Sequence, residues 1–231
     1  MVQIHHVAII LDGNRRHAKE KGISSVQGHK EGAQTLLNLL PFFAKTSIST
    51  LTLYVFSCEN FKRDPQEIEP LFALFLQEYQ SKNLQKKLQE YETRVCFAGD
   101  MTLFSQDIQQ AVHTLEKKTA HFTKRRLNLA FGYGGRQEIL RATKQVVADV
   151  VANNISLDAI DEKLFSTYLS IQDDPDIIIR TGGAIRTSNF LPWQSVYSEW
   201  FFLKTYWPQI TESHIQQVLD EFASRKRNFG C

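Results

Sequence analysis

The chain has 231 residues, of which 42% are hydrophobic and 23% charged, and its formal net charge is +2. This composition is typical of one globular α/β domain covering residues 1–231, and the mild charge argues against a nucleic-acid partner, because duplex binders carry a concentrated basic stripe. No run approaches the roughly 20 apolar residues that span a bilayer, and Asp12 interrupts the first apolar run, so we expect neither a transmembrane helix nor a signal peptide.

Apolar β-branched runs alternate with amphipathic segments along the chain. Strands are predicted over residues 6–11, 50–56, 93–98, 127–131 and 176–179. Helices are predicted over residues 31–45, 67–89, 106–120, 136–153 and 212–227, where apolar side chains recur every three or four positions. Strict alternation of strand and helix predicts right-handed crossovers and a mainly parallel sheet with helices on both faces.

Polar clusters follow four of the predicted strands. They comprise residues 12–16, residues 57–60 with Arg63, residues 132–136, and residues 180–183 with Arg186 and Ser188. Because ligands of open α/β sheets bind beyond the carboxyl ends of the strands, we expect these clusters to form one site. A carboxylate among arginines, Asp12 with Arg15 and Arg16, indicates a divalent cation that bridges to a polyanionic ligand. Neither nucleotide-binding fingerprint is present, which argues against a bound nucleotide.

Several other polar residues have a simpler structural explanation. The acidic residues 173–176 contain a proline and precede an apolar strand, so we interpret them as a turn rather than a metal site. His5 and His6 have no third ligand nearby in sequence and are interpreted as structural, and residues 124–126 are interpreted as a solvated loop. For His29, near a predicted helix start, a ligand-facing role and a simple helix-start role remain open.

The helix predicted over residues 67–89 has an unusually wide apolar surface. Its apolar residues from Ile68 to Tyr79 cover more of the circumference than one sheet contact needs. The helix is therefore either sandwiched between the sheet and a neighbour, or it lines a hydrophobic tunnel.

The cysteines bear on the redox setting. Cys58, Cys96 and Cys231 are odd in number and lack metal-ligand spacing. They indicate reduced thiols and a cytoplasmic setting, at most with peripheral contact with a membrane.

Long motifs in a fixed order cover nearly the whole chain. They are residues 6–14 (HVAIILDGN), 28–32 (GHKEG), 51–60 (LTLYVFSCEN), 97–100 (FAGD), 128–136 (NLAFGYGGR), 174–181 (DPDIIIRT), 188–194 (SNFLPWQ) and 207–208 (WP). Through these motifs the chain resembles the cis-prenyltransferases, most closely the bacterial undecaprenyl diphosphate synthases. The resemblance implies a homodimer whose subunits each have a central parallel sheet of six strands, flanking helices and a hydrophobic tunnel.

The resemblance also implies a reaction, a cofactor and site residues. Isopentenyl diphosphate would be condensed onto an allylic diphosphate with Mg²⁺. By this analogy Asp12 is the catalytic aspartate and a metal ligand, Glu199 is the second metal carboxylate, and Asn60 acts in proton removal or substrate orientation. The allylic site would be lined by Gly13, Asn14, Arg15, Arg16, His29 and Arg63, and isopentenyl diphosphate would be held by Arg180, Arg186 and Ser188. The adjoining candidate substrate-binding positions are His17, Ser25, Ser57, Cys58, Glu59, Phe61 and Thr187.

The chain departs from the family pattern at several positions near this site. Arg15 and His17 stand where a glycine and a tryptophan are usual, and Ser25 stands where an arginine is usual. Ala184 and Ile185 replace a glutamate and a histidine, a change that bears on metal affinity. We hypothesise that the guanidinium of Arg15 compensates for the one missing at Ser25.

The resemblance favours an active enzyme that extends farnesyl diphosphate to undecaprenyl diphosphate, the lipid carrier for cell-wall synthesis, with release of the product at the inner membrane face. A short- or medium-chain enzyme is the alternative within the family, because Val55 is bulkier than the small residue usual there and narrows the tunnel floor. A catalytically silent scaffold subunit is the alternative from another class. The retained groups at Asp12, Asn60, Arg180 and Glu199 argue against it, because a scaffold does not need them together.

Overall fold

The computed structural model describes residues 3–225. The strands of this part of the chain form one sheet of six strands. In sheet order these are β3 (Thr93–Ala98), β4 (Arg125–Tyr133), β2 (Thr50–Ser57), β1 (His6–Ile10), β5 (Ile177–Arg180) and β6 (Glu199–Phe202). Every neighbouring pair is parallel. The predicted parallel sheet is confirmed, and β6 is the sixth strand that the family resemblance implied.

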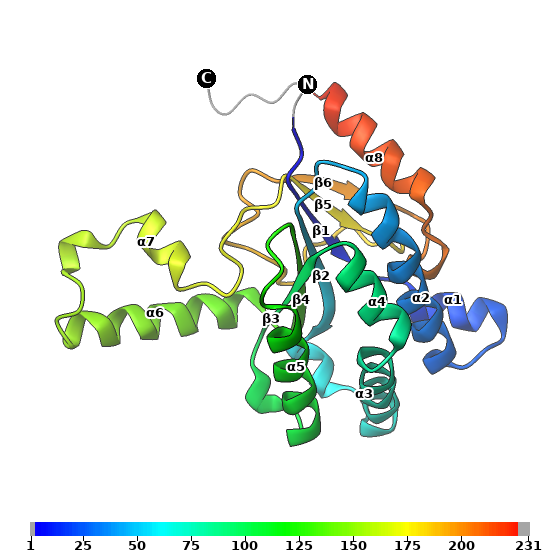
Figure 1. Ribbon diagram of the computed structural model, residues 1–231, viewed down its shortest axis with the longest axis horizontal. Helices are drawn as coiled ribbons and strands as arrows, with labels where there is room; N and C mark the ends of the chain where they lie inside the picture. Colours follow the sequence, from blue (N-terminus) through cyan, green and yellow to red (C-terminus); the bar gives the residue numbers. More distant parts are fainter. Residues whose placement is uncertain (1–2, 226–231) are drawn as a thin grey trace.

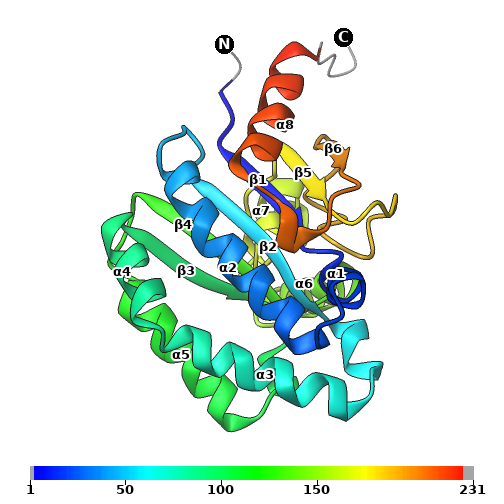
Figure 2. The same ribbon diagram turned by 90° about the vertical axis from the view of Figure 1, so that its right-hand side faces the viewer.

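Helices connect the strands and pack mainly on one face of the sheet (Figure 2). They are α1 (Asn14–Lys21), α2 (Ser25–Ala44), α3 (Pro65–Tyr79), α4 (Lys82–Glu90), α5 (Gln106–Thr119), α6 (Gly135–Val151), α7 (Glu162–Thr167) and α8 (Glu212–Ser224). Short 3₁₀ turns cover Cys58–Lys62, Met101–Leu103, Leu157–Ala159 and Trp207–Gln209. Helices α6 and α7 project from the body as an arm (Figure 1).

The central strand β1 is buried along its whole length. Val7 and Ile9 face a core that includes residues of α2, α5 and α8, whereas Ala8 and Ile10 face a second core that includes Phe190. Successive side chains of a strand point to opposite faces, so this one strand contributes to both cores. The second face is covered in part by the irregular segment around Phe190, where the sequence led us to expect helices alone.

The largest differences from the predicted helices concern α1, α2 and the α3–α4 pair. The helix predicted over residues 67–89 is two helices, because α3 ends at Tyr79 and the Ser81 side chain caps the start of α4. The apolar residues keep a helical spacing across this break, so the sequence pattern did not reveal it. Helix α2 begins at Ser25, earlier than predicted, because Ser24 accepts a hydrogen bond from the first turn in the manner of an N-cap. Helix α1 was not predicted, since its short sequence is almost entirely polar.

The histidines and acidic residues beside β1 have the structural roles predicted for them. His6 is 3% exposed, and its Nε2 lies 2.7 Å from Oγ1 of Thr52. The Asp176 carboxylate accepts the backbone N–H groups of His5 and His6 at 2.8 and 3.0 Å. These contacts fix the entry to β5. By contrast, the basic residues 125–126 belong to β4 and not to the loop that we expected.

The remaining global predictions concern membranes and thiols. Within residues 3–225, no helix combines the length and hydropathy needed to cross a bilayer. Cys58 and Cys96 are unpaired, as predicted. Cys231 and the predicted end of the last helix, residues 226–227, lie outside the described residues.

Candidate active site

A cavity of about 750 Å³ opens at the carboxyl ends of β1, β2 and β5. The predicted site residues that line it are Asp12, Asn14, Arg15, His29, Ser57, Glu59, Asn60, Arg63, Arg180, Arg186 and Ser188. They follow strands that neighbour one another in the sheet, so the parallel topology brings their side chains to one edge. The predicted convergence of the polar clusters is confirmed for the clusters after β1, β2 and β5.

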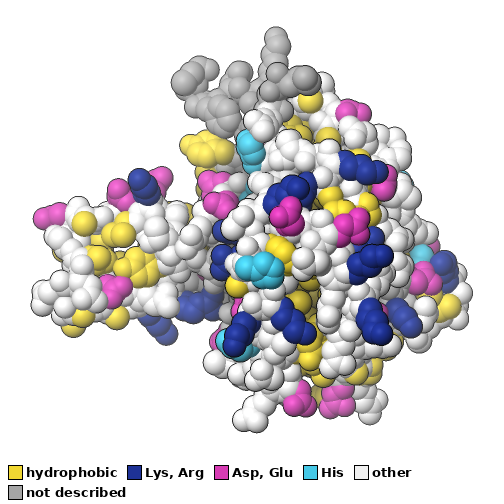
Figure 3. All heavy atoms as spheres, viewed as in Figure 1, with side chains coloured by type: hydrophobic (Ala, Val, Ile, Leu, Met, Phe, Trp, Pro, Cys, Tyr) yellow, Lys and Arg dark blue, Asp and Glu magenta, His cyan; other side chains and the backbone are white. Residues whose placement is uncertain are grey.

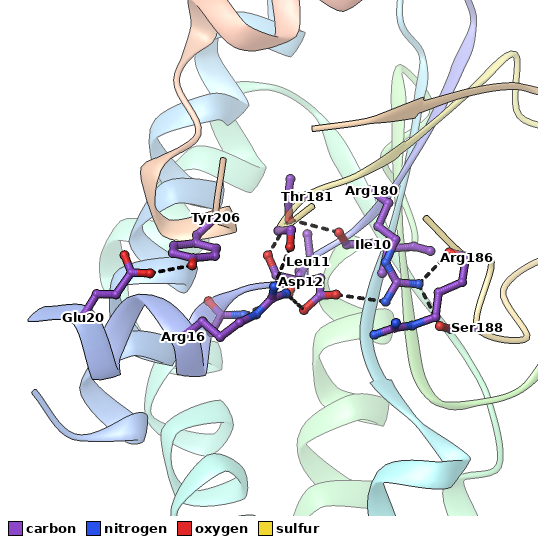
Figure 4. A network of polar contacts seen from close by, with 12 residues as sticks. Ile10, Leu11, Asp12, Arg16, Glu20, Arg180, Thr181, Arg186, Ser188 and Tyr206 are labelled. Carbon is purple, nitrogen blue, oxygen red and sulfur yellow. Dashed lines mark hydrogen bonds and ion pairs between the residues drawn. The ribbon is translucent and has the colours of Figure 1, made fainter. Parts of the chain in front are cut away.

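Asp12 lies at the centre of the polar wall, between two arginines (Figure 4). Its Oδ1 accepts a hydrogen bond from Arg16 at 3.0 Å, and its Oδ2 accepts one from Arg180 at 2.9 Å. Burial alone would raise the pKa of Asp12, but hydrogen bonds from Arg180 and Arg16 outweigh burial and lower this pKa below its ordinary value. The carboxylate is therefore ionised at neutral pH.

Arg180 organises the loop on the β5 side of Asp12. Its side chain is 5% exposed. One guanidinium nitrogen, Nη1, donates to the carbonyl of Arg186 at 2.6 Å and to Oγ of Ser188 at 2.7 Å. The Arg180 guanidinium is buried and planar, and it donates to three acceptors: the Arg186 carbonyl, Ser188 Oγ and Asp12 Oδ2. Because one rigid plane fixes the directions of all three hydrogen bonds, the group is held in one orientation. Arg186 and Ser188 are thereby held at the cavity edge (Figure 4).

A second basic group lies on the α1 and α3 side of the cavity. Arg15 and Arg63 both donate from Nη1 to Oε1 of Glu67, each at 3.2 Å. His29 lies beside them, and its buried Nε2 has no hydrogen-bond partner among residues 3–225. Burial and the positive charges of Arg63 and Arg15 lower the pKa of His29 to about 4. This side of the site therefore offers two cations and a neutral imidazole, which suits a polyanion.

Gly13 shapes the turn between β1 and α1. Its φ is +112°, in the left-handed region that side chains disfavour, and a Cβ there would lie 2.7 Å from the Tyr206 ring. The next residue, Asn14, donates from Nδ2 to the carbonyl of Leu11 at 2.9 Å. Gly13 thus keeps the loop tight, although its own atoms do not line the cavity.

Asn60 lies on the β2 side, in the turn that follows the strand. Its Oδ1 accepts the backbone N–H of Ser57 at 3.1 Å, which is one half of a capping box. The remaining amide nitrogen, Nδ2, is the group that can donate to a ligand in the cavity. Asn60 is therefore held in a fixed orientation in the cavity wall.

The inner part of the cavity is apolar. It is lined by Leu71, Phe72, Leu74, Phe75 and Tyr79 of α3 and by Phe97, Leu115, Leu129 and Phe131 of β3, α5 and β4. Val55 of β2 also lines it, at a β-bulge where the register with β4 shifts. Such a bulge re-aims side chains. The wide apolar surface of α3 therefore lines a cavity, as one of the two interpretations predicted, and Ile68, Phe72, Phe75 and Leu76 also pack in a core cluster.

Some predicted substrate-binding residues lie away from the cavity. His17 is 2% exposed and its Nε2 lies 2.7 Å from the Glu31 carboxylate, so it is held in the contact between α1 and α2. The Cys58 thiol donates to the carbonyl of Gly132 at 3.0 Å. Phe61 packs in an aromatic cluster that includes Phe56, with ring centroids 5.0 Å apart. Ser25 and Thr187 are also absent from the lining, Ser25 in the first turn of α2 and Thr187 in an exposed loop.

The predicted metal ligand Glu199 does not lie near Asp12 in this chain. Glu199 opens β6 and pairs in register with Ile177, the first residue of β5, so it lies at the opposite end of the sheet from Asp12. Its carboxylate accepts a hydrogen bond from Arg225 at 2.6 Å. Within residues 3–225, no three His, Cys, Asp or Glu side chains form a metal cage. A Mg²⁺ ion fits the site as an ion shared by Asp12 and substrate phosphates, since Mg²⁺ commonly uses one or two carboxylates with phosphate oxygens.

The structure also adds site residues that sequence reasoning missed. Glu67 joins two arginines, and Asn189, Tyr54 and Trp207 line the cavity. Glu67 is the first residue of the helix predicted over residues 67–89 and lies four residues after Arg63, a spacing that could have suggested the ion pair. The other three are brought in by contacts distant in sequence, which no local pattern reports.

Comparison with known proteins agrees with this geometry. The family model described as "Putative undecaprenyl diphosphate synthase" matches residues 10–230. The geranylgeranyl-diphosphate-specific tritrans,polycis-undecaprenyl-diphosphate synthase of Pyrococcus abyssi is 40% identical over 97% of this chain and 86% of its own. The farnesyl-diphosphate-specific ditrans,polycis-undecaprenyl-diphosphate synthase of Buchnera aphidicola is 39% identical over 98% of this chain and 91% of its own.

A solved structure extends the comparison to the fold. The lavandulyl diphosphate synthase of Lavandula x intermedia, in complex with dimethylallyl diphosphate, superposes with a TM-score of 0.94 at 27% identity and 99% coverage of both chains. The family match and the identities of the curated relatives cover almost the whole sequence. This chain therefore belongs to the undecaprenyl diphosphate synthase family, the cis-prenyltransferases.

Proposed function

We propose that residues 1–231 act as one cis-prenyltransferase domain that extends farnesyl diphosphate with isopentenyl diphosphate to undecaprenyl diphosphate, the lipid carrier for cell-wall synthesis. One observation carries the proposal: two groups of cationic donors flank an ionised aspartate at the mouth of an apolar cavity of about 750 Å³. Such a site suits two diphosphates and a growing hydrocarbon chain.

The two donor groups divide the substrates between them. Arg15, Arg63 and His29 receive the allylic diphosphate, whose hydrocarbon tail extends along α3. Arg186 and Ser188, held by Arg180, receive isopentenyl diphosphate. Asp12 lines the same cavity and is held by Arg16 and Arg180. This arrangement places the allylic carbon and the alkene close together, which lowers the entropic part of the barrier.

In each cycle a carbon–carbon bond forms to the allylic carbon, the allylic carbon–oxygen bond breaks, and a proton passes from the isopentenyl unit to the released diphosphate. Negative charge grows on the departing diphosphate, and fixed guanidinium donors stabilise it without reorganisation. Asp12 would hold Mg²⁺ together with the substrate phosphates, and the ion would supply further positive charge to stabilise the departing diphosphate. The amide of Asn60 is not a base, so we assign it to substrate orientation. The apolar lining excludes water that would capture the carbocation-like allyl group.

We further propose that the enzyme is a homodimer that works in the cytoplasm and releases product at the membrane. The arm of α6 and α7 carries exposed apolar side chains on its surface (Figure 3). They include Leu140, Val147, Val151 and Leu157, which are 55–77% exposed. A cluster of exposed large apolar residues is typical of an interaction surface, and a second copy of the chain is the partner that the family resemblance indicates.

A short- or medium-chain product is the second candidate. The lavandulyl diphosphate synthase, similar to this chain with a TM-score of 0.94, was solved with the short allylic compound dimethylallyl diphosphate. Val55, at the bulge in the cavity wall, is the residue that would restrict the tunnel. Both observations are compatible with a limited chain length.

One experiment separates these functions. Purified protein is incubated with Mg²⁺, labelled isopentenyl diphosphate and, in parallel, dimethylallyl, geranyl, farnesyl or geranylgeranyl diphosphate, and the products are sized. We expect extension of farnesyl diphosphate to undecaprenyl diphosphate. A shorter limiting product would favour the second candidate, and no extension of any primer would favour a silent scaffold subunit.

A further inference from the structure

Residues 188–191 form a loop with unusual backbone geometry beside the active site. Ser188, Asn189 and Leu191 have φ values of 51°, 61° and 50°, in the left-handed region that side chains disfavour. Such a conformation is strained for a residue with a side chain and persists only where surrounding contacts hold it. Ser188 contacts Arg180, so this strained loop carries one of the diphosphate donors.

The carboxamide of Asn189 makes the contacts that hold the loop. Its Nδ2 donates to Oε1 of Glu59 at 3.1 Å and to Oε1 of Gln137 at 3.0 Å. Its Oδ1 accepts the backbone N–H of Arg136 at 2.9 Å, and its carbonyl accepts that of Gly135 at 2.8 Å. Asn189 thus joins three parts of the chain: the turn after β2, the first turn of α6, and the loop after β5.

These contacts fix the distance between two sides of the cavity, the side that carries Asn60 and the side that carries Ser188. Glu59 adjoins Asn60, which lines one side of the cavity, and Asn189 adjoins Ser188, which lines the other. A second contact across the gap comes from Tyr54, whose hydroxyl donates to the Ser188 carbonyl at 3.3 Å. A direct side-chain link between the turn after β2 and the loop is the hydrogen bond from Asn189 to Glu59.

We propose that Asn189 is a positioning residue that fixes the Arg186–Ser188 donors relative to Asn60, and so determines the affinity for isopentenyl diphosphate rather than for the allylic substrate. The inference rests on the proposed function for its assignment of the two diphosphates. Arg15 and Arg63 are paired with Glu67, and these ion pairs do not involve Asn189.

The test uses Asn189→Gly, because glycine adopts a φ of 61° without strain and removes only the side-chain hydrogen bonds. We expect the KM for isopentenyl diphosphate to rise roughly tenfold, as for the loss of one or two net hydrogen bonds, with the KM for farnesyl diphosphate unchanged within about twofold. Asn153→Gly is the matched control, because Asn153 also has a positive φ of 56° but follows α6 on the arm. It should leave both constants unchanged.

A second variant keeps the proposal testable if Asn189→Gly folds poorly. Asn189→Asp retains the acceptor for Arg136 but places a carboxylate against Glu59, and the KM for isopentenyl diphosphate should rise again. In the double variant with Glu59→Gln, the new amide at position 59 can donate a hydrogen bond to the new carboxylate at position 189. The contact is thereby restored with donor and acceptor exchanged. Partial recovery of the isopentenyl diphosphate KM in the double variant is the expected result, and a loop that served only to stabilise the fold would not show it.

The outcomes separate the two proposals. If wild-type protein extends a primer and Asn189→Gly leaves both KM values unchanged, or raises them equally, the positioning role is refuted and the proposed function stands. If wild-type protein extends no primer, the proposed function fails. Calorimetric binding of isopentenyl diphosphate to wild-type and Asn189→Gly protein then decides the positioning role, with equal Kd values or no binding to either protein counting against it.

Discussion

Changing Asp12 to asparagine probes the centre of the site with little change in shape. The substitution removes the negative charge that faces Arg180, whose side chain is 5% exposed, and Arg16, whose side chain is 48% exposed. A lost hydrogen bond to a charged group costs about 1.5–3 kcal/mol when buried and much less when exposed, so we expect a stability loss of about 2 kcal/mol, mainly through Arg180. Typical domains have about 5–15 kcal/mol, so the variant should fold.

The effect on catalysis should be much larger than the effect on stability. Removing one preorganised electrostatic group costs about 10²–10³ in kcat, and Asp12 is also the proposed metal ligand, so we expect a loss of about a thousandfold or more. Asp12→Ala should likewise abolish nearly all turnover. The assay measures incorporation of labelled isopentenyl diphosphate beside thermal unfolding, with a substitution of the exposed Asp107 in the first turn of α5, Asp107→Asn, as the charge-matched control. A folded Asp12→Asn protein with kcat within about tenfold of wild type would refute the assignment.

Three further predictions test other parts of the structure. Restoring an arginine by Ser25→Arg should change the allylic KM little if Arg15 already compensates, and a large improvement measured in steady-state kinetics would show that it does not. Val55→Ala should enlarge the cavity and lengthen the product seen by chromatography, and an unchanged product distribution would contradict a restricting role. Burial lowers the pKa of His6 in the folded state from 6.5 to about 4. As the pH falls, the unfolded state therefore binds a proton before the folded state does, and the free energy of unfolding decreases between pH 6.5 and about 4. Urea unfolding should show a loss of about 3 kcal/mol from this residue between pH 7 and 4, and His6→Gln should flatten the pH dependence.

The interaction between Arg15 and Glu67 sharpens the hypothesis about the missing arginine. Arg15 is 56% exposed and shares the Glu67 carboxylate with Arg63, so its guanidinium lies next to a cation already at the cavity. Ser25 does not line the cavity. The structure therefore places the extra positive charge of this chain on α1, close to the cavity mouth, which is the arrangement that compensation requires.

The local sequence determined the fold class and the centre of the site. A fully apolar strand that ends in Asp12, followed by alternating helices and strands, is sufficient to predict a parallel sheet with polar groups at its carboxyl edge. Asn60, Arg180 and Ser188 follow their strands in the same way. This inference succeeds because strand direction and the position of the following loop are set by neighbouring residues and by the parallel topology.

Tertiary structure alone decided where side chains meet across that edge. Asn189 contacts Glu59 from a position 130 residues away, and no periodicity reports such a contact. Glu199 has the residue type of a metal ligand, yet its place at the first position of β6 puts it at the far end of the sheet from Asp12. Sequence pattern determines which residues a strand delivers to an edge, whereas strand register and packing determine which of them share a ligand, because those depend on contacts between distant segments.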